Sequence, residues 1–182
     1  MNEHRQLDNG NIRLTFRRTE RDTAGAFLEM EAVYRAGSLR PPAHFHPAQE
    51  ELFEIVEGSL RFNVGGEERT VKAGERLVIP ARTVHQAWND SAGETRAVWT
   101  VRPALRTQRM FETLYGLAMD GKTNAAGTPN LLQTVMVARE YRNEFVVATP
   151  PVFVQNCVFG ILAPIASLLG YRAHYDQYSI GE

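Results

Sequence analysis

The chain has 182 residues, a formal net charge of −1 and one cysteine, Cys157. This length allows one domain with a hydrophobic core, or one domain with an appendage, but not two domains of ordinary size. The near balance of acidic and basic residues, mixed along the chain, argues against nucleic-acid binding. A single cysteine excludes an intrachain disulfide, and the first twenty residues lack the apolar run of a secretory signal, so we expect a cytoplasmic protein.

The first part of the chain, up to about Val101, predicts a succession of short strands. In residues 28–34, LEMEAVY, apolar side chains alternate with glutamates at the period of two that is typical of a half-buried strand. Residues 59–64 repeat this alternation, and the Gly65-Gly66 pair that follows predicts a hairpin because glycine tolerates positive φ. Regular turn signals without a helical period predict an antiparallel sandwich or barrel.

The period changes after Pro103, and the remaining residues predict a helical extension. Thr128 is a suitable N-cap, and Pro129 then fits the first position of a helix. Pro164 is expected to kink the last helix, and Gly170 to end it. We expect helices at about residues 111–118, 129–145 and 152–169.

One stretch of the extension carries no charged residue, between Glu144 and Arg172. Its length could cross a bilayer as one helix, but its prolines and polar side chains would be costly in hydrocarbon. We therefore expect helices that cover an open sheet edge or a second subunit in a homodimer. Two alternatives stay open: the helices form a lid over the barrel mouth, or residues 146–171 contact a membrane.

The segment PPAHFHPAQEELFEIVEG, residues 41–58, suggests a metal site. His44 and His46 are two residues apart, so on an extended segment both imidazoles point to the same side. Glu51 heads a strand whose same-face side chains are apolar, and a buried carboxylate needs a cationic partner. His85 follows a proline-containing turn and supplies a fourth ligand. Three imidazoles and one carboxylate suit Fe, Mn, Ni, Zn, Co or Cu, without selecting among them.

The segment at residues 41–58 and the segment that contains His85, residues 74–89, resemble the paired motifs of the cupin superfamily. The resemblance covers about residues 25–102 in a single copy, so the chain resembles a small single-domain cupin of the cupin-2 type. It departs from the pattern in the longer spacing after Gly37 and in Arg82, where the second motif usually has glycine. We prefer Glu51 to Glu50 as the ligand because of its distance from Gly58. The matching residues are Gly37, His44, His46, Glu51 and Gly58 in the first motif, and Gly74, Pro80, His85 and Asn89 in the second.

The resemblance implies a mainly β fold, an antiparallel jelly-roll barrel at residues 1–102 that holds one metal, with a helical C-terminal extension at residues 103–182. Arg82 is either a solvated turn residue or a cap at the barrel mouth that attracts an anionic ligand. The expected substrate-pocket residues are Phe53, Ile55, Phe62, Leu77, Arg82, Trp88 and Trp99.

The function that follows is a metal-binding cupin that acts as a dioxygenase-like oxidoreductase on a small, flat, weakly polar substrate, an enol or an aromatic compound. The alternatives are a non-catalytic cupin that binds a small molecule, and a metal-dependent isomerase or lyase. Glu51 is the expected proton-transferring residue, if it leaves the metal. His4 and His174 are not expected to act in catalysis.

Overall fold

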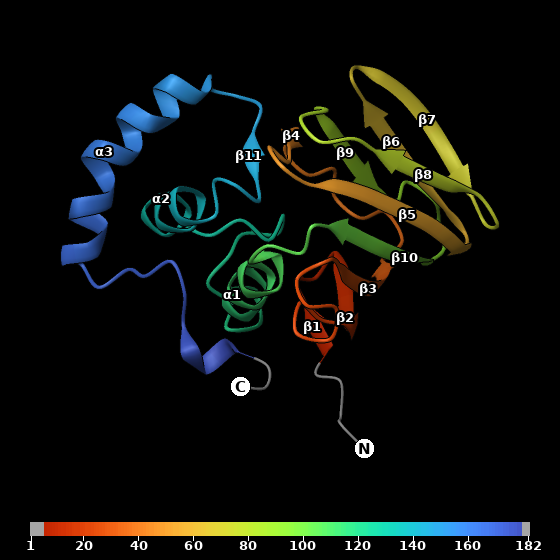
Figure 1. Cartoon of the computed structure of the whole chain (residues 1–182), viewed down its shortest axis with the longest axis horizontal. Coiled ribbons are helices and arrows are strands. Elements are labelled where there is room, and N and C mark those ends of the chain that lie inside the picture. The colour runs from red at the N-terminus through yellow and green to blue at the C-terminus, as the bar shows by residue number, and fades with distance from the viewer. Residues whose placement is uncertain (1–5, 180–182) are drawn as a thin grey trace.

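The computed structural model describes residues 6–179, which form a two-sheet β structure with helices on one side (Figure 1). His4 lies outside the described residues. The strands are β1 (Gln6–Asp8), β2 (Ile12–Arg18), β3 (Leu28–Tyr34), β4 (His44–Phe45), β5 (Glu50–Glu57), β6 (Ser59–Val64), β7 (Glu67–Lys72), β8 (Arg76–Ile79), β9 (His85–Trp88), β10 (Thr95–Arg102) and β11 (Val146–Val147). The helices are α1 (Thr107–Met119), α2 (Leu131–Glu140), α3 (Val152–Leu168) and the short 3-10 helix η1 (Asp176–Tyr178).

The two sheets together have the arrangement of a jelly-roll barrel. One sheet has the strand order β1-β2-β3-β10-β5-β8, and the other has the order β11-β4-β9-β6-β7. The strand pairs of both sheets are antiparallel. The non-consecutive neighbours, such as β10 between β3 and β5, are the crossovers that bring distant segments together. The fold class predicted from the sequence is confirmed.

The alternating strands supply the barrel core. The apolar side chains of β3 are buried, whereas Glu29 and Glu31 between them are partly exposed. β6 likewise buries Leu60 and Phe62, and the hairpin to β7 turns at Gly65 and Gly66, both with positive φ. Burial of these apolar faces stabilises the barrel by about 25 cal/mol per Å² removed from water.

Gly58 of the first motif and Arg82 of the second motif both have a left-handed backbone conformation. Gly58, between β5 and β6, has a φ of 78°, and a Cβ there would lie 2.6 Å from Thr95 Oγ1. Glycine is therefore required twice, by conformation and by space. Arg82 has a φ of 66°, which explains why glycine is the usual residue in the second motif.

The helices of the extension overlap the predicted ranges, but α1 begins at Thr107 rather than near residue 111, and α2 ends at Glu140 rather than near residue 145. Asn130, not Thr128, caps α2, because its side chain accepts a hydrogen bond from Gln133 N at 3.1 Å. Pro164 lies inside α3, and Gly170 follows its end with positive φ. α3 packs on α2 and is the helix farthest from the barrel in Figure 1. Among residues 6–179, no helix is both long and apolar enough to cross a membrane.

The extension also contributes a strand, which the sequence did not predict. β11 pairs with β4 in antiparallel register, Val146 with Phe45 and Val147 with His44. A two-residue strand has no periodicity of its own, so its sequence carries no signal. The extension thus continues the barrel sheet on the edge that holds His44.

Candidate metal centre

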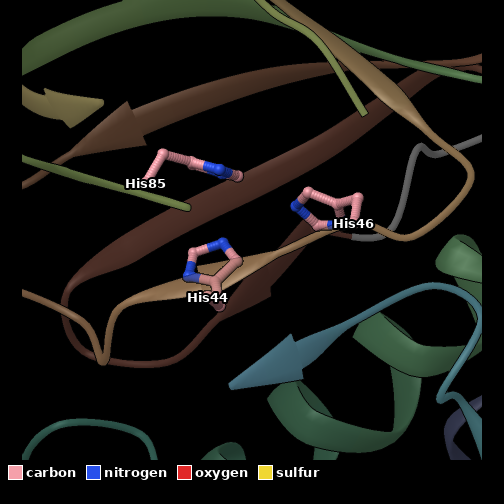
Figure 2. A group of neighbouring side chains, drawn as sticks. All are labelled: His44, His46 and His85. Carbon is pink, nitrogen blue, oxygen red and sulfur yellow. The ribbon is translucent and has the colours of Figure 1, made fainter. Parts of the chain in front are cut away.

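Three histidines converge between the strands of the barrel (Figure 2). His44 in β4 pairs directly with His85 in β9, and His46 follows β4 on the same side of the chain. One ring nitrogen of each histidine lies within 4.8 Å of those of the other two. Figure 2 shows the three imidazoles around a common space, as the spacing of His44 and His46 predicts.

Each imidazole is held by a backbone carbonyl at the nitrogen that faces away from this space. His44 Nδ1 lies 2.9 Å from Pro42 O, His85 Nδ1 lies 2.9 Å from Thr83 O, and His46 Nδ1 lies 2.5 Å from Glu144 O. A carbonyl only accepts, so each Nδ1 carries a proton and donates it. In the neutral rings this leaves the three Nε2 atoms with free lone pairs, which is the arrangement of histidines that ligate metals.

Glu51 completes the cluster from β5. Its Oε1 lies 3.2 Å from His46 Nε2, and its Oε2 lies 2.7 Å from His85 Nε2. The carboxylate is only 1% exposed, and its Oε1 also accepts a hydrogen bond from Trp99 Nε1 at 3.0 Å. The four residues predicted from the motifs therefore lie together.

The electrostatics keep the carboxylate charged and His44 neutral. Burial lowers the pKa of His44 to about 3, and the nearby His85 and His46 add to this effect. Burial opposes ionisation of Glu51, but His46 and His85 lower the pKa of its carboxyl below the ordinary value. Burial also acts against protonation of His46, but Glu51 outweighs it and raises the pKa of His46.

The unpaired polar atoms of the cluster fit a metal. Within residues 6–179, His46 Nε2 and Glu51 Oε2 are buried without a hydrogen-bond partner. The short contact between His85 Nε2 and Glu51 Oε2 sets two lone pairs against each other when Nδ1 holds the proton. Such a contact is stable only with a cation or a proton between the atoms. Three imidazole nitrogens and one carboxylate are a suitable donor set for a divalent transition metal.

The extension forms part of this site. The carbonyl that holds His46 belongs to Glu144, and the ring of Phe145 stacks on His44 with centroids 4.5 Å apart. The Glu144 side chain is buried and accepts a hydrogen bond from Arg106 Nε at 3.0 Å, just before α1. No motif marks Glu144 and Phe145, because their contacts with His46 and His44 join positions about a hundred residues apart.

The seven predicted substrate-pocket residues lie in different surroundings. Five of them are packed in the barrel core, with an exposed fraction of 9% or less: Phe53, Ile55, Phe62, Leu77 and Trp99. Trp88 lies opposite Arg61 in the sheet, outside the core cluster, with the Arg40 guanidinium 4.3 Å above its ring. Arg82 is exposed, and its Nε donates to Pro47 O at 3.3 Å.

The alternation of a strand identifies inward side chains but not whether empty space remains between them. The assignment of these seven residues to a substrate pocket therefore stays a prediction. His174, near the C-terminal end of the described chain, contacts Thr113 and Ser179 and is not part of the cluster.

A large cavity lies instead between the barrel and the extension. Its volume is about 710 Å³, and β4, α1, α2, the segment after α2 and α3 all contribute to its walls. Phe45 and Phe145 are among the lining residues, whereas the cluster of histidines and Glu51 is not. The sequence indicated this feature only through its uncharged stretch.

Trp99 positions Glu51, a role that differs from the predicted one. Replacement of Trp99 by phenylalanine is expected to weaken metal binding by roughly 10–100-fold, the usual effect of losing a hydrogen bond to a ligand. Titration with Co²⁺ or Zn²⁺ against a chelator would measure this. Trp88→Phe is the matched control, because Trp88 contacts Arg40 and not the cluster. Equal affinities of the two variants would contradict this role.

Comparison with known proteins agrees with the motifs. A family model described as "Cupin domain" matches residues 30–101. Probable oxidoreductase yanE of Aspergillus niger is 25% identical over 176 residues, which cover 87% of this chain and 65% of that protein. Oxidoreductase macE of Penicillium terrestre is 32% identical over 98 residues, 47% of this chain and 37% of that protein.

A third relative, polyketide synthase CurC of Streptomyces cyaneus, is 35% identical over 72 residues, 40% of this chain and 46% of that protein. The chain thus spans less than two thirds of the length of each of these relatives. The match to yanE is long enough to include much of the helical extension as well as the barrel.

Two solved structures share the fold. KdgF from Halomonas sp. has a TM-score of 0.50 at 18% identity, covering 58% of this chain and 92% of that one. A predicted oxalate decarboxylase from Thermotoga maritima has a TM-score of 0.50 at 16% identity, covering 54% of this chain and 90% of that one. At these identities the likeness concerns the fold alone.

Proposed function

We propose that this chain, a member of the cupin superfamily through its domain at residues 30–101, is a metal-dependent oxidoreductase. The observation that carries the proposal is the cluster of three histidines whose Nδ1 atoms all donate to backbone carbonyls, with the Glu51 carboxylate beside their Nε2 atoms. Two relatives named as oxidoreductases support the reaction class.

A bound metal and the residues around it would have different roles in the reaction. A divalent transition metal bound by His44, His46, Glu51 and His85 would supply Lewis-acid or redox chemistry to a substrate. The carbonyls fix the orientation of the imidazoles, and Trp99 fixes Glu51. The packed core around the cluster excludes water, which strengthens each electrostatic contact.

The substrate class proposed is a small, flat, weakly polar molecule with an enol or phenol group. One relative is named a polyketide synthase, and polyketides commonly carry such groups. The dioxygenase-like form of the reaction predicts that oxygen is consumed. A metal-dependent isomerase or lyase would convert the same substrates without oxygen, and a non-catalytic binding protein would be stabilised by them without forming a product.

The test combines elemental analysis of the purified protein with an oxygen electrode. We expect about one equivalent of a transition metal per chain, and oxygen uptake with members of a panel of enols and catechols only in the metal-loaded protein. Glu51→Gln should abolish turnover and leave measurable metal binding. Absence of any bound transition metal after loading would overturn the proposal. Formation of a product without oxygen uptake would contradict the oxidoreductase reaction and would favour a metal-dependent isomerase or lyase.

The outer face of α3 supports a homodimer. Apolar side chains on this helix are strongly exposed, among them Phe153 at 70%, Ile161 at 67% and Leu168 at 89%. A helix that is apolar on all sides is normally buried. We propose that a second copy of the chain covers this face.

Ile161→Glu and Leu168→Glu are therefore expected to convert a dimer to a monomer, because each places a charge in the interface. Size-exclusion chromatography with light scattering would measure the molar mass. Thr70→Glu, on the exposed strand β7 on the other side of the molecule (Figure 1), is the control for added charge and should stay dimeric. A monomeric wild-type chain at micromolar concentration would contradict the proposal.

A further inference from the structure

One side chain, that of Phe145, contacts both the cavity between the barrel and the extension and the histidines of the metal centre. β4 is extended, so its two residues point to opposite sides: His44 turns into the barrel, and Phe45 lines the cavity. Phe145 lines the cavity as well, and its ring stacks on His44 at 4.5 Å and approaches His46 at 6.1 Å between centroids. Phe145 is therefore the shared wall of the two sites.

We propose that this cavity binds the apolar body of the substrate, and that Phe145 determines which substrates reach the histidine cluster from it. This inference rests on the proposed function and adds the substrate class. The ligand is an uncharged, mainly apolar molecule of small-molecule size with an enol or phenol oxygen at one end. The oxygen lies toward the histidines, and the body lies among the helices.

The volume and the walls select this ligand. Small-molecule sites usually have volumes of roughly 300–1,000 Å³, and about 710 Å³ lies within that range. The walls include Leu114 of α1, Val135 of α2 and Phe159 of α3, and Arg142 is the one charged residue among the described lining residues. The desolvation of an ionic ligand would be costly here, because the walls offer too few charges to offset it. Transfer of an apolar ligand from water into the cavity is favourable.

The uncharged stretch of the sequence has its explanation here. The residues between Glu144 and Arg172 begin with Phe145, continue through β11 and contribute one side of α3 to the cavity wall. A charge in this stretch would face either the cavity or the exposed apolar side of α3. The cavity thus explains why the side of α3 that lines it carries no charge. A dimer interface on the opposite side of α3 would not explain this.

The first experiment measures binding to the metal-free protein with N-phenyl-1-naphthylamine, an uncharged fluorophore. We expect saturable binding of one dye per chain. Ala138→Trp and Val158→Trp each add volume inside the cavity and should weaken binding at least 10-fold. Ile161→Trp adds an indole to the exposed face of α3 and should leave binding unchanged. Circular dichroism confirms that each variant is folded.

Binding that Ile161→Trp abolishes and both cavity variants retain would overturn the proposal and assign the dye to the outer face of α3. Failure of the wild-type chain to bind the dye would overturn it as well. Neither outcome depends on a metal or on turnover, so failure here is distinguishable from failure of the proposed function.

The second experiment tests the connection through Phe145. In the Co²⁺-loaded protein, 1-naphthol is expected to change the visible absorption of the cobalt, and Ala138→Trp should lose this response while Ile161→Trp keeps it. Phe145→Ala should change the apparent affinity for 1-naphthol by at least 5-fold. A cobalt spectrum that 1-naphthol leaves unchanged, in a chain that binds the dye, would overturn the assignment of the cavity to the substrate.

Discussion

Replacement of His85 by alanine is expected to weaken the binding of a divalent transition metal by more than roughly 100-fold. Loss of an outer hydrogen bond to a ligand already costs 10–100-fold, and His85 is one of the proposed ligands themselves. His85 is 2% exposed, and its Nε2 faces the Glu51 carboxylate. Competition for Co²⁺ or Zn²⁺ with a chromogenic chelator would give the affinity.

His174→Ala is the matched control, because this histidine lies outside the cluster and should leave metal affinity unchanged. Thermal unfolding gives a second measurement. Metal at 100 times its Kd should stabilise the wild-type chain by about 2.7 kcal/mol and should leave His85→Ala almost unaffected. A His85→Ala chain that binds the metal within a few-fold of wild type would show that the ion lies elsewhere.

Replacement of Phe62 by alanine is expected to lower the free energy of unfolding by about 3–5 kcal/mol. Phe62 has no exposed surface, and its ring packs edge-on against Phe53 with centroids 5.1 Å apart. For a chain of this size the change corresponds to a loss of roughly 6–20 °C in Tm. Chemical denaturation followed by circular dichroism would measure it.

Val78→Ala is the control for loss of an apolar group from a strand, because Val78 is 46% exposed and should cost no more than about 0.5 kcal/mol. The pair also separates the two interpretations of Phe62. A core residue changes stability, whereas a wall of an open pocket changes substrate affinity. An unchanged Tm together with a weakened substrate interaction would place Phe62 in the wall of a pocket.

The barrel and the histidine cluster could be predicted because their signals are local. Alternation in β3 and β6 identifies the buried faces, and the glycines at 65 and 66 identify a hairpin. The spacing of His44 and His46 places two imidazoles on one side of any extended segment. These patterns depend on neighbours a few residues apart, which a single sequence displays directly.

The remaining features depend on contacts between distant residues. Trp99 donates to Glu51 across a strand pair, and the Glu144 carbonyl holds a histidine 98 positions earlier in the chain. Neither tryptophan nor glutamate indicates such a role by its residue type, and β11 is too short to show the alternation of a strand. The cavity could not be located either, since it arises from the space that α2 and α3 leave beside the barrel.

The pairing of β11 with β4 has a consequence for how this protein can be divided. A chain cut after residue 102 would keep every proposed metal ligand but would lose the strand beside His44 and the carbonyl that orients His46. Its sheet would also end in an open edge, the kind of surface on which unrelated chains aggregate. The helical segment is therefore not a removable module, and fusions or domain exchanges should join this protein beyond residue 147, never at the end of β10.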